Sequence, residues 1–422
     1  MTFWQKLTIV FTDKYIRRKI IFVLLILAAF RLLAAIPIPG VDTFRLQSFL
    51  DSNQFLGLLN IFSGGGLSAL SIVMMGVGPY ITGSIIMQLL TLMSPRLKSM
   101  YHEEGTEGRQ RFAQYSRYLT VPLSLIQAYA LLAILNSQGV LGVLSAYDKA
   151  IAMIVVTAGS LFLVWLGELI TEHGIGYGVS VIIFAGIVAA LPSSINQLVF
   201  TYDPSKLLTY IGFLAVAVVL ISGIVLITEA ERLLPVTYAK QARAGGVMGA
   251  QSSYVPLRIN QAGVMPVIFA LSVLMFPQLF ANFFANSSHA WLQSVSEALT
   301  WFLQNNWLYA VVYFFLVFLF TYFYTAVTFD PESMATNLQK NGAFVPGIRP
   351  GVSTTEYIGK IVSRITFMGA IFLGIVAVLP IIMQQVTGLA TLAIGGTAVL
   401  IVVSVILDIL KKVEGQVSMR QY

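Results

Sequence analysis

Ten runs of mostly apolar residues recur along the chain, and no other feature restricts its fold as much. A run of about 18 or more apolar residues with few charges is long enough to cross a bilayer as a helix. Only 10% of the 422 residues are charged, whereas soluble domains carry roughly 25%, which argues against a soluble fold. The sequence predicts an all-α polytopic membrane protein, with spans at about 20–38, 69–93, 119–135, 151–167, 179–192, 207–228, 262–285, 307–329, 365–383 and 389–410.

Lysine and arginine are distributed unequally between the two faces that ten spans define. The face with both chain ends carries 21 of the 25, the opposite face carries three, and Arg31 lies within the first span. Cytoplasmic segments of membrane proteins are rich in Lys and Arg, so we expect both termini in the cytoplasm. The N-terminal apolar run is too long for a signal peptide and is interpreted as a retained span. Arg31 is expected to extend toward the membrane surface.

The stretch "NIFSGGGLSALSIVMMGVGPYITGSIIMQLL", at 60–90, is broken twice. Three glycines occupy 64–66, and Gly-Val-Gly-Pro follows at 76–79. The part before the three glycines is too short to span, and non-helical chain at membrane depth must be buried in protein or line a cavity. We therefore predict a short re-entrant element followed by a true span. The fifth run, 179–192, is also short, so it either takes residues from 175–178 or lies surrounded by other helices.

Residues that carry chemistry are scarce. His102, His173 and His289 are far apart, cysteine is absent, and the phosphate-loop and nucleophile-elbow motifs are missing. A multispan membrane enzyme is therefore disfavoured, and we expect no metal or cofactor. Ion-coupled transporters usually hold a charge inside the membrane. A broken-helix secondary transporter of a small solute is the alternative function, although the spans contain no evident coupling site.

Two segments on the basic face, about 229–261 and 329–364, are too long for simple connectors. Both mix glycine, proline and basic residues. One interpretation is that they are flexible loops that carry the usual cytoplasmic positive charge. The other is a docking surface for a large, partly acidic partner, and basic loops also bind RNA phosphates without specificity.

Five sequence motifs resemble, in order, those of the SecY family, the central channel subunits of bacterial protein translocases. The resemblance covers about residues 3–420 but not the external loops 136–150 and 286–306. It implies two pseudo-symmetric five-helix halves, 1–206 and 207–422, around a central hourglass pore. The motifs are the stretch at 60–90, "WLGELITEHGIGYGVSVIIFAGIVAALP", "RINQAGVMPVIFA", "NLQKNGAFVPGIRPG" and "GGTAVLIVVSVILD".

The resemblance also implies the site residues. A ring of apolar side chains at the constriction would consist of Val77, Ile81, Val179, Ile183, Ile268 and Ile401. Val179 is included because it lies one turn before Ile183 on the same helix face. A movable plug helix would occupy about 57–70 and include Gly64, Gly65, Gly66 and Leu67. Residues that dock a translocation motor or ribosome would be Arg349, Arg243, Lys240 and Arg258.

A lateral gate is implied between the second and third spans on one side and the seventh and eighth on the other. Gln88 is a polar residue on the second span, and it serves either the gate or an ordinary pairing with a neighbouring helix. A ring of branched apolar side chains can dewet and block ions at rest, yet it offers a passing polypeptide no specific binding. The expected function is a channel that moves unfolded secretory proteins across the plasma (inner) membrane and releases transmembrane segments into it. The implied partners are SecE, SecG, SecA, the ribosome, precursor polypeptides with signal sequences, and membrane lipids.

Overall fold

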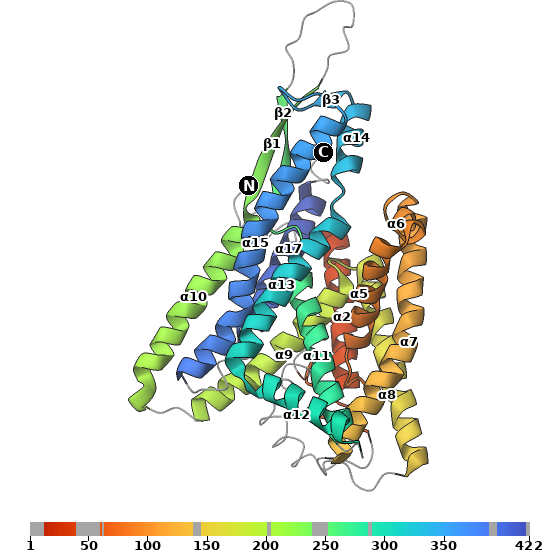
Figure 1. Ribbon diagram of the computed structural model, residues 1–422, viewed down its shortest axis with the longest axis vertical. Helices are drawn as coiled ribbons and strands as arrows, with labels where there is room; N and C mark the ends of the chain where they lie inside the picture. The colour runs from red at the N-terminus through yellow and green to blue at the C-terminus, as the bar shows by residue number, and fades with distance from the viewer. Residues whose placement is uncertain are drawn as a thin grey trace, which may run out of the picture.

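The computed structural model describes residues 12–38, 60, 63–137, 145–200, 204–238, 252–285, 289–387 and 395–418. Helices dominate this part of the chain, and three short strands pair at one end (Figure 1). The helices are α2 (Lys14–Ala34), α5 (Gly78–Met93), α6 (Pro95–His102), α7 (Gly105–Ser137), α8 (Ala146–His173), α9 (Gly178–Phe200), η1 (Pro204–Lys206), α10 (Leu207–Glu229), α11 (Met265–Ala285), α12 (Ala290–Gln304), α13 (Asn306–Thr328), α14 (Pro331–Lys340), α15 (Val352–Thr387) and α17 (Gly395–Ser418). The strands are β1 (Glu231–Tyr238), β2 (Ser252–Arg258) and β3 (Ala343–Phe344).

Each predicted span coincides at least in part with one helix, so the prediction of a helical protein with several apolar helices is confirmed. Among the described residues, α7, α8, α10, α13 and α15 are long and apolar enough to cross a membrane. Shorter apolar helices are formed by α5, the part of α9 up to Pro192, and the first part of α11.

Several predicted spans have different limits in the structure, and two of these differences bear on the candidate site. Residues 63–77 form successive turns, so the second span begins as a helix only at Gly78. Gly64, Gly65 and Gly76 have positive φ angles of 69°, 81° and 57°, a conformation that glycine adopts without steric cost. The predicted end of the fifth span at 192 is wrong, because α9 continues to Phe200. A proline removes only one helical hydrogen bond, so the helix can resume beyond it.

The long basic segments contain regular structure. β1 pairs with β2 and β3 in an antiparallel sheet of order β2-β1-β3. This sheet and α14 pack on the first half of α15 through an apolar cluster that includes Leu234, Val236 and Ile358. We call β1, β2, β3, α14 and the start of α15 the sheet unit. The interpretation of flexible loops is therefore wrong for the described part of these segments.

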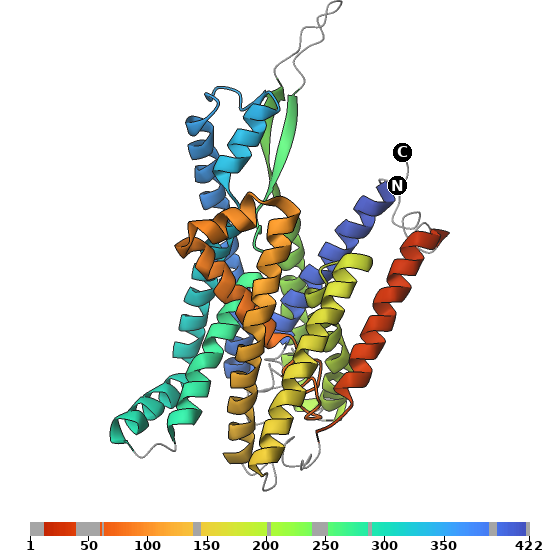
Figure 2. The ribbon, with the colours of Figure 1, turned by 90° about the vertical axis from the view of Figure 1, so that its right-hand side faces the viewer.

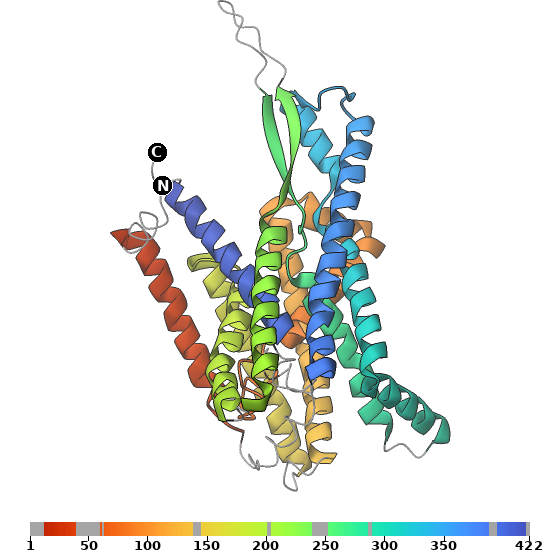
Figure 3. The ribbon, with the colours of Figure 1, turned by 90° about the vertical axis from the view of Figure 1, so that its left-hand side faces the viewer.

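The sheet unit projects from one end of the helical bundle (Figures 2 and 3). The start of α2 and the end of α17 also lie together, because Ile16 and Val417 share a small apolar cluster. At the opposite end, residues 290–304 form α12, which lies within the segment 286–306 that was predicted to be a loop. The main apolar core lies in the bundle, where α5, α9, α11 and α17 meet.

Candidate functional site

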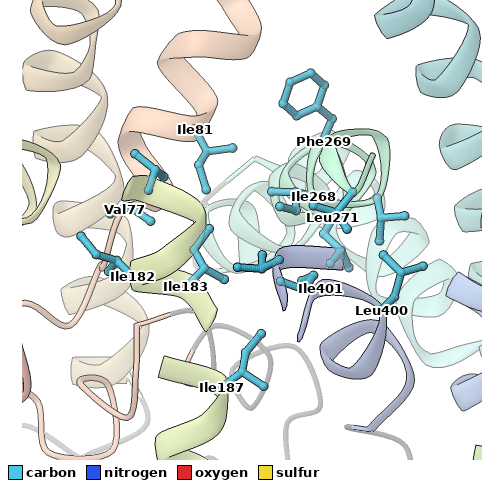
Figure 4. Packing of buried hydrophobic residues seen from close by; sticks show 14 of the residues in the cluster. Val77, Ile81, Ile182, Ile183, Ile187, Ile268, Phe269, Leu271, Leu400 and Ile401 are labelled. Atoms are coloured by element: carbon cyan, nitrogen blue, oxygen red, sulfur yellow. The ribbon is translucent and has the colours of Figure 1, made fainter. Parts of the chain in front are cut away.

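The fold brings together the six apolar residues predicted to form a ring. No more than 7% of any of them is exposed, and all belong to one apolar cluster. Figure 4 shows five of them approaching a common centre from the four helices α5, α9, α11 and α17. We call these six residues the constriction; they are Val77, Ile81, Val179, Ile183, Ile268 and Ile401.

Local sequence explains how the first turns of α5 and α9 are placed at the constriction. Val77 is the N-cap residue of α5, and a proline in the first turn fixes the start of the helix. The Gly178 amide donates a 2.9 Å hydrogen bond to the Thr171 hydroxyl of α8 at the start of α9. A Cβ atom on Gly178 would overlap the Gly167 carbonyl. Glycine therefore allows α8 and α9 to approach closely enough to place Val179 and Ile183 in the core.

Ile187 lies beside the constriction and was not predicted. It is 3% exposed and belongs to the same apolar cluster. Figure 4 shows it on α9, one turn beyond Ile183 and along the same side. The four-residue spacing from Ile183 could have identified it, since the same spacing in the other direction selected Val179.

The chemistry of the constriction is simple, because none of its side chains can form a hydrogen bond. Water or an ion at this point would lose hydrogen-bonding partners and gain none. Branched apolar side chains can move between rotamers without breaking a polar contact. The arrangement can therefore exclude ions at rest and still yield to a larger apolar or extended solute.

Residues 63–77, which we call the seated segment, pack beside the constriction against α7 and α8. Leu67, Leu70 and Met74 are each at most 2% exposed. Their apolar neighbours are Ala128, Leu131, Leu132, Leu135, Ala152 and Val156. The segment includes the predicted plug residues Gly64, Gly65, Gly66 and Leu67, which form turns instead of a helix. Residues 57–59 and 61–62 of the predicted plug lie outside the described residues.

Two backbone hydrogen bonds fasten the seated segment to the chain that follows α2. The Ile38 amide donates to the Leu70 carbonyl at 2.8 Å, and the Ile72 amide donates to the Ile36 carbonyl at 3.1 Å. The Ile72 carbonyl also lies against α8 at Gly159, where a Cβ atom would overlap it. Backbone hydrogen bonding and close packing thus hold the second part of the segment in place.

Arg31 contributes a further contact to the seated segment. Its Nη1 donates a hydrogen bond to the Gly64 carbonyl at 2.5 Å, and the buried Phe30 ring lies against the same glycine. The expectation that Arg31 only extends toward the membrane surface missed this contact. Residues 31 and 64 are too far apart in sequence for a local pattern to pair them.

We expect Arg31→Met to loosen the seated segment. A hydrogen bond from a charged donor contributes about 1.5–3 kcal/mol when buried, and the exposure of Arg31 reduces this to about 1 kcal/mol. Such a loss raises the unseated population about fivefold. The chain lacks cysteine, so maleimide labelling of Ser71→Cys, a fully buried position, measures unseating. Arg31→Lys, which keeps a charged donor, is the control. Equal labelling rates with Arg31, Arg31→Met and Arg31→Lys would contradict the role of Arg31.

Gln88 borders a cavity of about 370 Å³ at the end of the bundle nearest the sheet unit. Its Nε2 donates to the Ser84 hydroxyl of its own helix at 3.4 Å, and its Oε1 has no hydrogen-bond partner. Asn260 and Gln261 line the same cavity and also have unpartnered carboxamide oxygens. The interpretation that Gln88 is simply paired with a neighbouring helix is therefore not supported.

A hydrogen bond that does join α5 to a neighbouring helix lies nearer the start of α5. Gln127 of α7 donates a 3.5 Å hydrogen bond to the Thr82 hydroxyl. α5 contacts α7, α11 and α13, and α7 also contacts α11. The helices predicted to border a lateral gate are thus adjacent.

The predicted docking residues have different surroundings. Arg349 is exposed in the turn before α15, and its carbonyl accepts a 2.8 Å hydrogen bond from the Thr354 hydroxyl. Arg258 pairs with Glu231 across β1 and β2, with an Nε–Oε1 distance of 3.5 Å. Lys240 and Arg243 lie outside the described residues. Arg349 is therefore the predicted docking cation that the structure presents most clearly.

Comparison with known proteins gives a consistent family. Residues 71–410 match the SecY family model. The chain is 39% identical to the protein translocase subunit SecY of Corynebacterium glutamicum, with 98% of this chain and 97% of that protein covered. It is 42% identical to the subunit of the same name from Halalkalibacterium halodurans, with 96% of each chain covered.

Solved structures show the same fold at lower identity. A structure of a protein conducting channel aligns with a TM-score of 0.63 and 17% identity, covering 93% of this chain and 91% of the other. Sec61 in the canine ribosome-channel complex aligns with a TM-score of 0.59 and 16% identity over the same shares. At these identities the likeness establishes the fold alone. The family match and the near full-length sequence identity together show that this chain, a multi-pass membrane protein, belongs to the SecY family.

Proposed function

We propose that this chain is the channel subunit through which unfolded secretory polypeptides cross the plasma membrane. One observation carries the proposal. The constriction is built from α5 and α9 in the first half of the chain, 1–206, and from α11 and α17 in the second half, 207–422. A pore between two halves is narrowest where both contribute side chains. Ten spans in two five-helix halves around an hourglass pore, with both termini in the cytoplasm, would produce this arrangement.

The constriction is the seal of the resting channel. Its apolar side chains exclude hydrated ions by dewetting, and the seated segment acts as a plug beside it. A polypeptide that enters from the side of the sheet unit displaces the seated segment and parts the constriction. The side chains then close around the polypeptide without a polar contact that would retain it.

The lateral gate lies between α5 and α7 on one side and α11 and α13 on the other. Helices in contact, with few polar links between them, can separate at low cost when an apolar segment takes their place. The Thr82–Gln127 hydrogen bond joins α5 to α7 on the same side of this gate, so it does not have to break when the gate opens. Gln88 has an unpartnered oxygen that can accept a hydrogen bond from a signal sequence during this exchange. Apolar segments then leave for the lipid.

The driving force comes from partners, because the subunit itself is not an enzyme. ATP hydrolysis by SecA, or chain elongation by the ribosome, pushes the polypeptide. SecE and SecG complete the membrane complex, and the precursor presents a signal sequence. The sheet unit is the docking surface, since it projects from the bundle and carries the exposed Arg349 (Figure 1).

We expect Arg349→Glu to impair motor-driven export more than assembly of the complex. Reversing one interfacial charge places like charges together, which commonly costs about 2 kcal/mol or more and corresponds to roughly a thirtyfold loss of affinity. Binding of SecA to proteoliposomes measures the effect. Arg18→Glu, a reversal at an exposed position of α2 outside the sheet unit, is the matched control. Normal SecA binding and export in Arg349→Glu would remove this residue from the docking surface.

Reconstitution tests the proposed function as a whole. Vesicles that contain the chain with SecE and SecG, supplied with SecA and ATP, are expected to protect a secretory precursor from added protease. A precursor without its signal sequence is the control. Saturable uptake of a small solute without any precursor transport would overturn the proposal in favour of a broken-helix transporter. The constriction, to which both halves contribute side chains, is apolar and offers a small polar solute no binding group.

A further inference from the structure

The helix α12 has contacts that fix it at the end of the bundle opposite the sheet unit. It follows α11 and precedes α13, and it projects obliquely from the side of the bundle (Figures 2 and 3). The buried Ser296 hydroxyl donates a 2.7 Å hydrogen bond to the Ala281 carbonyl of α11. The Phe302 and Tyr309 rings, with centroids 6.4 Å apart, join α12 to α13. α12 is therefore a docked helix with a defined orientation.

At 100° per residue, the side chains of α12 divide into three faces. The protein face consists of Leu292, Ser296, Leu299 and Leu303, which are buried or half-buried. A second face is exposed and apolar and consists of Trp291, Val295 and Ala298. A third face is exposed and polar and consists of Gln293, Glu297 and Gln304.

Neither water alone nor hydrocarbon alone suits both exposed faces of α12. Trp291 is 67% exposed and Val295 is 39% exposed, which disfavours immersion in water. Glu297 is exposed as well, which disfavours immersion in hydrocarbon. A helix that lies in the bilayer interface, with its apolar side toward lipid and its polar side toward water, satisfies both conditions. α10 provides a contrast, since its exposed side includes the apolar residues Leu208, Leu214 and Val219.

An exposed apolar stripe also lies on the span that follows α12. Trp307, Val311, Phe315 and Leu319 follow one another at four-residue spacing along α13, and each is at least half exposed. This stripe is a lipid-facing surface of a membrane helix. Trp301 and Trp307, both 62% exposed, lie where α12 meets that stripe, and tryptophan is enriched at the boundary between headgroups and acyl chains.

We propose that α12 binds the lipid surface itself. Its Trp291 face lies in the boundary between headgroups and acyl chains of the leaflet opposite the sheet unit, and its Glu297 face lies in water. The surface recognised is the bilayer interface rather than a protein partner, because exposed tryptophans lie on α12 and at its junction with the membrane-facing stripe of α13. The inference does not depend on what passes through the protein.

Tryptophan quenching tests this placement in the complete reconstituted complex. The chain has five tryptophans, at positions 4, 165, 291, 301 and 307. Variants that keep only Trp291 or only Trp165, with the others changed to phenylalanine, are placed in phosphatidylcholine vesicles brominated near the headgroup or near the chain end. We expect Trp291 to lose most of its emission with the shallow label and little with the deep one. A variant in which Phe315→Trp supplies the single tryptophan, at a 63% exposed position near the middle of α13, is the deep control and should respond more to the deep label than Trp291 or Trp165.

A matched pair of cysteines removes the dependence on multiple tryptophan changes. Spin labels at Val295→Cys and Glu297→Cys are expected to differ, with the first more accessible to oxygen and the second to a water-soluble nickel chelate. Trp291 that is quenched by neither label, or equal nickel accessibility at both cysteines, would overturn the proposal. Quenching in the isolated chain that disappears in the complex would also overturn it, because a partner chain would then cover α12.

Discussion

Ile401→Asn is expected to make the resting channel leak ions. Ile401 is 1% exposed and enters the constriction from α17. A carboxamide in its place gives water a hydrogen-bonding partner at a point that otherwise offers none, and it thereby lowers the barrier to hydration. Each reduction of about 1.4 kcal/mol in that barrier raises ion passage about tenfold. Conductance across planar bilayers that contain the complex without substrate measures the change.

Two variants control for this result. Ile401→Leu preserves an apolar side chain and should leave conductance at the level of the unmodified chain. Ile406→Asn places the same polar group at a 40% exposed position on the same helix, so it reports general damage to α17. If Ile401→Asn assembles normally but changes neither conductance nor the requirement for a signal sequence, Ile401 does not belong to the seal.

Gly64→Ala should unseat residues 63–77 more strongly than the neighbouring change Gly65→Ala. Both glycines have positive φ angles, so both substitutions incur a backbone penalty of about 1–2 kcal/mol. At Gly64 the new Cβ atom would also overlap the Phe30 ring and lie 3.2 Å from the Gly186 Cα atom. Overpacking of this kind adds about 1–3 kcal/mol. At Gly65 the nearest atom, Arg31 Nη1, would be 3.5 Å away, so no overlap is added.

Labelling of Ser71→Cys in each background measures this difference, and ion leakage provides an independent readout. The additional 1–3 kcal/mol predicts labelling at least about fivefold faster with Gly64→Ala than with Gly65→Ala. Equal rates would mean that backbone strain alone is responsible and that Phe30 does not confine the segment. Unchanged labelling in both would show that residues 63–77 do not depend on their glycines.

Much of the helical framework was predictable, because a bilayer permits few alternatives. An apolar run such as 207–228 has to satisfy its own backbone hydrogen bonds in lipid, and a helix does so. It is observed as α10, with limits within one residue of those predicted. The constriction residues were predicted from motif resemblance instead, since valine and isoleucine are common at any lipid-facing position. Their convergence in the core depends on how four helices pack, which no local pattern encodes.

The features that the sequence did not predict have local compositions that resemble loops. α12 contains Gln293, Ser294 and Glu297 among its apolar residues, so average hydropathy conceals its faces, and only the helical spacing of Trp291, Val295 and Ala298 distinguishes it. In β1, Leu234 and Val236 alternate with exposed neighbours, a strand signal that a proline at 235 weakens. The Arg31 contact joins residues 33 positions apart, so it depends on tertiary structure.

A disulfide between the constriction and a polypeptide in transit would show the route of that polypeptide. The chain has no cysteine, so Ile183→Cys introduces a unique thiol at the constriction, and Leu226→Cys introduces one at a 69% exposed position on α10. A precursor with a single cysteine is arrested partway across by a folded domain at its C-terminus, and the complex is then oxidised. We predict a cross-link at position 183 that requires the signal sequence and the energy source, with none at position 226. A precursor that crosses the membrane without cross-linking at 183, or that cross-links equally at 226, would contradict passage through the constriction.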